Sequence, residues 1–326
     1  MRAPVTWYVV SHNAALRRRN HQVVVEIDDR SVAVIPASFL GSVVLDSGAR
    51  VSSEALRLLI KRRVPLVVLD GLGRVLGRLQ PDHGAAADLR LRQYELCTNP
   101  DARLEFARSV VAGKIHNQQV LAQRKLRRLP IEQRRTTVAL GQLEARARSA
   151  DSLAELRGLE GAASSIYWSA LRALPALEGF RHRDRHAPDV VNALLNYVSA
   201  LLRETLMRSV TSAGLDPMLS FYHEPFRTRP TLVFDLMEEW RPVVLESVVL
   251  ALIGLGRVGP TDIEDTGYGP RLRAEARAAA VERFHHRVHG AASGADGTYL
   301  DVMDRQVARV VAWARRGGPY EPYRWR

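Results

Sequence analysis

The hydrophobic pattern of this 326-residue chain changes once, near residue 80, and this change limits the fold more than any other feature. Before it, short runs rich in valine, leucine and isoleucine alternate with turn-forming residues. This pattern predicts strands at residues 6–11, 21–27, 31–35, 42–45, 64–69 and 74–79. One helix, which Ser52 or Ser53 can cap, is expected among them. The first 80 residues therefore predict a small β-rich domain.

Beyond a predicted linker at residues 81–87, the hydrophobic period becomes helical and stays so for most of the chain. Helices are expected near residues 88–96, 100–128, 131–149, 151–174, 188–213, 230–254, 270–289 and 298–316. A glycine-rich stretch at 254–270 is typical of a long loop, and the aromatic, basic tail at 319–326 is either frayed or a docking segment. The predicted fold class is α+β: a β-rich domain over residues 1–80, then a larger all-α domain over residues 88–326.

The charge balance favours a polyanionic partner. The chain has 47 basic against 35 acidic residues, a formal net charge of +12, and a pI near 10.4. Most of the positive charge is arginine, whose planar fork suits phosphate oxygens. A GC-rich genome would explain arginine in place of lysine, but not the surplus itself. Three basic segments, at residues 17–19, 124–135 and 181–186, are candidates for phosphate contacts and cannot be ranked from sequence.

Other features exclude several classes of protein. The single Cys97 cannot form an intrachain disulfide, which fits a reducing cytoplasm. No secretory pattern opens the chain, and the apolar run at 243–255 is short and contains Glu246, so we expect no membrane span. The sequence has no dinucleotide fingerprint, no phosphate-binding Gly-Lys-Ser/Thr loop, no multi-cysteine zinc site and no serine nucleophile elbow.

A histidine and two acidic residues are the strongest candidates for chemistry. His223 precedes a Glu-Pro pair and is expected in a loop, while Asp235 and Glu238 share one face of the helix that follows. A histidine and carboxylates from different elements can hold a divalent metal, and a phosphodiester is a natural substrate for a chain this basic. The alternative is a solvated acidic face on which Glu239 and Arg241 form a local ion pair.

Two other helices carry further candidates. Small residues follow Glu160 and allow close approach of a substrate, and Tyr167 lies on the same helix face seven positions later. The alternative for Glu160 is an ordinary solvated glutamate. Asn192 and Asn196 belong to a polar stripe on an otherwise apolar helix. Buried amides need partners, so this stripe is expected to brace a neighbouring site. The alternative is an amphipathic helix at the protein surface.

Together these segments resemble the CRISPR-associated endonuclease family that acts as the spacer-acquisition integrase. The resemblance covers nearly the whole chain. It rests, in order, on residues 35–45 (IPASFLGSVVL), 53–74, 113–118 (GKIHNQ), 159–167 (LEGAASSIY), 188–197 (PDVVNALLNY), 214–217 (GLDP), 223 and 235–242 (DLMEEWRP). Each segment is weak alone, but their order and spacing are specific. Ser220 and Trp240 stand where the family often has glycine and phenylalanine.

The resemblance implies a metal site. Glu160, His223 and Glu238 match the family's metal ligands, and Asp235 matches an additional active-site acid. The ion would be Mg²⁺ or Mn²⁺, and the histidine makes Mn²⁺ suitable. Three further positions match an aromatic beside the site and a signature of the central helical domain: Tyr167, Asn192 and Asn196.

The resemblance also implies a function, namely a metal-dependent DNA endonuclease and integrase of CRISPR adaptation, an antiviral defence. A fragment's 3′-hydroxyl would attack a phosphodiester of double-stranded DNA at the repeat boundary, and with water as nucleophile the same site would be a nuclease. The family forms a homodimer through its β domain, and two dimers sandwich a dimer of a small ferredoxin-like CRISPR partner protein. Two alternatives stay open: a transposon-encoded integrase of the same superfamily, and a non-catalytic DNA-binding scaffold.

Overall fold

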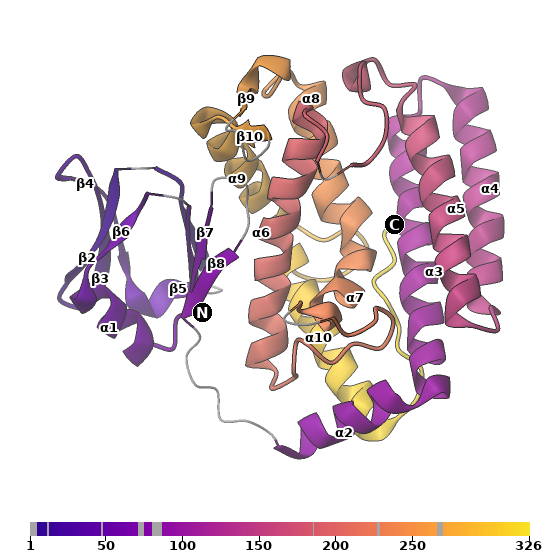
Figure 1. Cartoon of the computed structure of the whole chain (residues 1–326), viewed down its shortest axis with the longest axis horizontal. Coiled ribbons are helices and arrows are strands. Elements are labelled where there is room, and N and C mark those ends of the chain that lie inside the picture. Colours follow the sequence, from indigo (N-terminus) through magenta and orange to yellow (C-terminus); the bar gives the residue numbers. More distant parts are fainter. Residues whose placement is uncertain are drawn as a thin grey trace. The chain divides into compact units, whose positions relative to one another are not determined.

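The computed structural model describes residues 5–11, 13–46, 48–70, 75–79, 87–184, 186–226, 229–265 and 270–326 (Figure 1). Its β-rich N-terminal region is followed by a mostly helical one, which confirms the predicted α+β class. The chain divides into two compact units. The first contains Met1–His83, Arg185–Glu204 and Val258–Glu282, and the second contains Gly84–Asp184, Thr205–Arg257 and Arg283–Arg326. Predicted linker residues 81–86 lie outside the described residues, and the domain limits at 1–80 and 88–326 stay a prediction.

The N-terminal part of the first unit contains two four-stranded sheets. One has the order β1 (Val5–Val9), β5 (Leu40–Leu45), β7 (Leu66–Leu69) and β8 (Val75–Leu79), with only β8 antiparallel to its neighbour. The other has the order β4 (Arg30–Pro36), β3 (Gln22–Ile27), β2 (Ala14–Arg19) and β6 (Arg50–Val51). Helix α1 (Ser53–Lys61) begins where expected, because the Ser52 side chain accepts a hydrogen bond from the Ala55 N–H at 3.2 Å. Leu16, Val43 and Leu59 are fully buried in the shared core.

Strand β2 is missing from the sequence-based expectation. Only its first residues show alternating burial, with Ala14 and Leu16 inside, before the exposed run 17–19. Three successive charged side chains hide the period of a strand, since alternation is the main signal. The backbone of these arginines nonetheless pairs with β3 in an antiparallel ladder.

Except at 230–254, the predicted helices agree with the structure to within a few residues. They are α2 (Ala87–Thr98), α3 (Pro100–Lys125), α4 (Pro130–Arg148), α5 (Leu153–Leu171), α6 (Val190–Ser212), α7 (Thr231–Trp240), α8 (Ser247–Gly254), α9 (Ala274–Val288) and α10 (Tyr299–Arg316). Asn99 caps α3 by accepting from the N–H of Asp101 and Ala102, and proline follows at the first helical position. Within the described ranges, no helix is both long and apolar enough to cross a bilayer.

Two local expectations are wrong. The predicted loop 254–270 contains a 3₁₀ turn, η4 (Pro260–Asp262), and β9 (Ile263–Asp265), which pairs with β10 (Pro270–Leu272). Strands of three residues are too short to show a period, and they make the C-terminal part less than purely helical. The predicted helix 230–254 is interrupted by a π-helical turn, η3 (Arg241–Glu246), which contains Pro242 and therefore lacks one backbone donor.

In the second unit, α3, α4 and α5 pack against one another and α7 packs on α3 (Figure 1). An aromatic cluster ties further segments to α3. The Phe106 ring lies 4.8 Å from Phe221, 5.1 Å from Trp313 and 4.6 Å from Tyr320, measured between ring centroids. Phe221 belongs to the loop before α7, and Tyr320 belongs to the C-terminal tail. The tail is therefore a docked segment, and the frayed alternative is wrong.

Candidate active site

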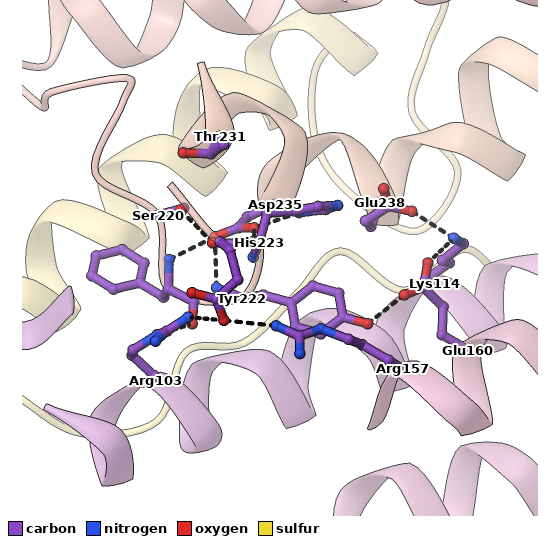
Figure 2. A network of polar contacts seen from close by, with 12 residues as sticks. Arg103, Lys114, Arg157, Glu160, Ser220, Tyr222, His223, Thr231, Asp235 and Glu238 are labelled. Atoms are coloured by element: carbon purple, nitrogen blue, oxygen red, sulfur yellow. Dashed lines mark hydrogen bonds and ion pairs between the residues drawn. The ribbon is translucent and has the colours of Figure 1, made fainter. Parts of the chain in front are cut away.

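One buried carboxylate organises the loop before α7. Asp235 is fully buried, and its Oδ2 accepts hydrogen bonds from the N–H of Phe221 at 2.8 Å and of Tyr222 at 3.0 Å. Its Oδ1 accepts from the His223 N–H at 2.8 Å and lies 2.7 Å from the ring Nδ1 (Figure 2). Because both Asp235 oxygens already accept from backbone N–H groups, Nδ1 is the donor to Asp235 and Nε2 is the nitrogen left for another partner.

Asp235 holds the ring of His223, and Ser220 holds its backbone. Burial lowers the pKa of His223, but the hydrogen bond and the charge of Asp235 outweigh burial and raise this pKa above its ordinary value. The Ser220 hydroxyl donates to the backbone carbonyl of His223 at 2.6 Å. Ser220 stands where the family often has glycine, and it thus makes a hydrogen bond that glycine could not make. The His223 side chain remains 35% exposed, so a substrate or ion can reach it.

Lys114 on α3 joins the carboxylates of two other helices. Its ammonium pairs with Glu160 Oε1 on α5 and lies 2.6 Å from Glu238 Oε2 on α7 (Figure 2). Burial lowers the pKa of Lys114, but the negative charges of Glu238 and Glu160 outweigh burial and raise it well above its ordinary value. The sequence-based candidates omit Lys114, whose only signal is its place in the family-like segment 113–118.

Glu238 is an ionised carboxylate in a buried place. Burial raises its pKa, but the charges of Arg241 and Lys114 outweigh burial and lower the pKa of Glu238 to about 2. Arg241 Nε donates to Glu238 Oε1 at 2.9 Å. Within the described residues, Oε2 has no hydrogen bond of good geometry and only its ion contact with Lys114. The expected alternative of a solvated acidic face is wrong, because Asp235, Glu238 and Glu239 are all buried.

Two tyrosines donate hydrogen bonds to acidic side chains in this region, and the site-lining role of Tyr167 stays a prediction. Tyr222, which was not a candidate, donates its hydroxyl hydrogen bond to Glu160 Oε2. Glu160 is therefore held on both oxygens, and the ordinary solvated alternative is wrong. Tyr167 donates instead to Glu246 Oε2 at 2.6 Å, on the π-helical turn. Burial, followed by the charge of Glu246, raises the pKa of Tyr167 well above its ordinary value, so this phenol acts as a neutral donor.

Two arginines lie beside the loop that carries His223 (Figure 2). Arg103 and Arg157 donate to the same Oε1 of Glu224, at 3.0 and 2.8 Å. Arg103 also donates to the Phe221 carbonyl at 3.0 Å. The loop that carries His223 is thus fastened to α3 and α5 from outside as well as to α7 from inside.

The three predicted metal ligands do not form a ligand group in this structure. Among the residues that the structure describes, no three His, Cys, Asp or Glu side chains are grouped so that they could bind a metal ion. The ammonium of Lys114 provides the physical reason, since it occupies the place between Glu160 and Glu238 where a shared cation would lie. The metal-ligand roles of Glu160, His223 and Glu238 stay a prediction.

The two predicted asparagines and the acidic cluster belong to different compact units of the chain. Asn192 and Asn196 are on α6, in the segment assigned to the first unit, whereas the acidic cluster belongs to the second. Asn192 is fully buried, and its side-chain amide donates to Asp189 Oδ2 at 2.8 Å. Asn196 is half-buried. Their role as site-lining residues stays a prediction.

Comparisons with known proteins agree on one family. The family model described as CRISPR associated protein Cas1 matches residues 7–286. A CRISPR-associated endonuclease Cas1 of Thermus thermophilus is 33% identical over 331 residues, which cover 99% of this chain and 100% of that protein. A Cas4/Cas1 fusion of Rhodospirillum rubrum is 30% identical over 86% of this chain, which spans 50% of the fusion.

A solved structure shows the same fold. The Cas1 protein of Thermotoga maritima matches with a TM-score of 0.82 at 19% sequence identity, over 98% of this chain and 100% of that one. At this identity the likeness concerns the fold alone, and the family model with the Thermus relative carries the assignment. This chain therefore belongs to the CRISPR-associated Cas1 family.

Proposed function

We propose that this chain is a metal-dependent DNA endonuclease and integrase that inserts short DNA fragments into a CRISPR array. The observation that carries the proposal is the pair of carboxylates, Glu160 and Glu238, that three helices bring onto one buried cation beside the accessible His223. Membership of the Cas1 family supports it, because relatives in that family are named CRISPR-associated endonucleases.

The donor chemistry fits a divalent cation that takes the place of the Lys114 ammonium between the two glutamates. Glu160, His223 and Glu238 would hold Mg²⁺ or Mn²⁺, with carboxylate oxygens for either ion and an imidazole that suits Mn²⁺. Glu238 Oε2, buried and without a good hydrogen bond in the described part of the chain, is a suitable ligand atom. When bound, such an ion supplies Lewis acidity, which lowers the pKa of an attacking hydroxyl and stabilises negative charge at phosphorus.

The surrounding residues orient these donors. Asp235 is a positioning residue: it accepts three backbone hydrogen bonds and fixes the His223 ring through Nδ1. Tyr222 holds Glu160, and Arg241 holds Glu238. Such outer contacts keep the ligand atoms in place before DNA arrives, so that little reorganisation accompanies the reaction.

The reaction we propose is transesterification. The 3′-hydroxyl of a fragment attacks a phosphodiester of double-stranded DNA, the new P–O bond forms, and the old 3′ oxygen leaves with a proton. We further propose that the chain acts as a homodimer formed through its N-terminal β-rich region, together with a small ferredoxin-like CRISPR partner. Both partner assignments follow from family resemblance.

A strand-transfer assay tests the proposal. The reaction contains the purified chain, a short duplex with free 3′-hydroxyl ends and a supercoiled plasmid that carries a repeat, with Mn²⁺ or with a chelator. We expect metal-dependent joining that falls by about 1,000-fold or more in Glu160→Ala, His223→Ala and Glu238→Ala. Glu178→Ala, at an exposed glutamate after α5, is the matched control.

The outcomes separate the alternatives. Joining that persists in all three variants would overturn the site. Cleavage without joining would leave a metal-dependent nuclease. Metal-independent DNA binding with neither cleavage nor joining would favour the scaffold alternative.

A further inference from the structure

A basic depression lies where α3 ends and α4 begins. It has a volume of about 670 Å³ and is lined by Arg124 and Arg127, by Arg134 on α4, and by Arg326 of the tail. Glutamine and threonine side chains supply further polar groups. Among the residues that the structure describes, no aspartate or glutamate lines it. The depression is therefore a surface rich in hydrogen-bond donors and without local compensating acids.

Its arginines differ from those at the acidic cluster. Arg103 and Arg157 both donate to Glu224, so their guanidinium groups already have a carboxylate partner. Arg127 and Arg134 are exposed, and in the described part of the chain neither guanidinium has a hydrogen bond or an ion pair. Their donors are available to an anion from outside.

The floor of the depression is held rigidly. The Arg124 guanidinium lies 4.0 Å from the centroid of the Trp325 ring, and Arg124 also donates to the Arg326 carbonyl. The backbone N–H of Trp325 donates to the Asn117 side-chain oxygen at 2.8 Å, which fastens the tail to α3. Positive charge is concentrated here by the fold.

The depression shares a helix with the acidic cluster. Lys114 and Arg124 are ten positions apart on α3, which corresponds to about 15 Å along the helix axis. Each strand of B-DNA carries one phosphate per roughly 3.4 Å of axis. A duplex whose reacting phosphodiester lies at the acidic cluster would bring other phosphates to the depression after about four or five base pairs.

We propose that this depression, formed by Arg124, Arg127 and Arg134, binds the phosphodiester backbone of the DNA on which the acidic cluster acts. The inference rests on the proposed function and ranks the 124–135 segment first among the basic segments. Arginine forks match phosphate oxygens and fix the position of a strand without reading its sequence. The binding is independent of any metal.

The test compares two double variants with the same loss of charge. Arg127→Gln with Arg134→Gln removes two exposed arginines that line the depression, and Arg128→Gln with Arg135→Gln removes their exposed neighbours that do not. Binding of a labelled duplex is measured by fluorescence anisotropy in chelator over a series of salt concentrations. We expect the first variant to bind about tenfold or more weakly, with the slope of log K against log salt reduced by about 2. The second variant should keep nearly the wild-type slope.

Equal effects of the two double variants, or no effect of the first, would overturn the inference. The strand-transfer assay is read separately with the wild-type chain. Loss of binding in the first variant, together with a wild-type chain that never joins DNA, would support the depression and reject the integrase. Metal-dependent joining by the wild type, with unchanged binding by the first variant, would support the integrase and reject the depression as a DNA-binding site.

Discussion

Two neighbouring glutamates on α7 reach opposite electrostatic states, although both are buried. Glu238 is 3% exposed and faces two full positive charges, Lys114 at 2.6 Å and Arg241 at 2.9 Å. Glu239 is fully buried and accepts its side-chain hydrogen bonds from neutral donors, while the charge of Arg309 has a smaller effect on its pKa. The neutral donors are the Tyr320 hydroxyl at 2.8 Å, the Gln306 amide at 3.1 Å and the backbone N–H of residue 323.

The different pKa values of Glu238 and Glu239 are caused by their different partners, since both side chains are buried. Lys114 and Arg241 hold the pKa of Glu238 at about 2, whereas burial raises the pKa of Glu239 to about 7 because its neutral donors offset only part of the penalty. Cations keep a buried carboxylate ionised far more effectively than dipoles do. Glu238 is thus suited to hold a metal, and Glu239 is suited to anchor the C-terminal tail on α7.

The largest expected effect is a difference in strand-joining activity between variants of these two residues. Glu238→Gln removes a charged ligand atom, so we expect strand joining to fall by about 1,000-fold or more. Glu239→Gln alters only contacts with the tail and with Gln306 on α10, so joining per folded molecule should stay within about threefold of wild type. Both variants are compared in the plasmid assay after circular dichroism shows them folded. An equal loss in the two variants would contradict the division of roles.

The second largest effect comes from removing the buried cation beside Glu238. Lys114→Met removes a buried cation and leaves Glu160 and Glu238 uncompensated, so the metal-free protein should lose about 3–5 kcal/mol of unfolding free energy. Mn²⁺ should restore more stability to this variant than it adds to wild type, because it replaces the missing positive charge. Urea unfolding with chelator and with Mn²⁺ measures both. Lys125→Met, on the same helix, is the control, and equal metal responses would contradict the prediction.

The smallest effect lies in the pH dependence of stability. The folded-state pKa of Glu239 is raised from 4.5 to about 7, so its contribution is full below pH 4.5 and is lost as pH rises through 7. The folded-state pKa of Glu238 is lowered from 4.5 to about 2, so its contribution is present above pH 4.5 and is lost as pH falls toward 2. Each shift corresponds to about 3 kcal/mol.

Urea unfolding between pH 3 and 8, in chelator, would separate the two contributions. Glu239→Gln should flatten the loss of stability near neutral pH, and Glu238→Gln should flatten the loss on the acid side. A neutral-side loss that persists in Glu239→Gln would assign it to another group.

Much of the architecture could be predicted because its signals are local. The change of period near residue 80 predicts α+β, and Ser52 and Asn99 act as helix caps in the structure. His223 and Asp235 could be paired in advance because they are close in sequence and the loop and helix that carry them adjoin. Signals failed where the local pattern was too short or was masked by charge, as in β9, β10 and the arginine-rich end of β2.

The sequence by itself determined the fold class, the helices and the identity of the acidic candidates. Only the tertiary structure decided which of them is charged and what each one holds. Glu238 and Glu239 are adjacent and chemically identical, and no local pattern distinguishes them. Their difference comes from Lys114, on another helix, and from Tyr320, which is 81 positions from Glu239. Helical periodicity determines which way a side chain faces, but long-range packing determines whether a cation or a dipole meets it there.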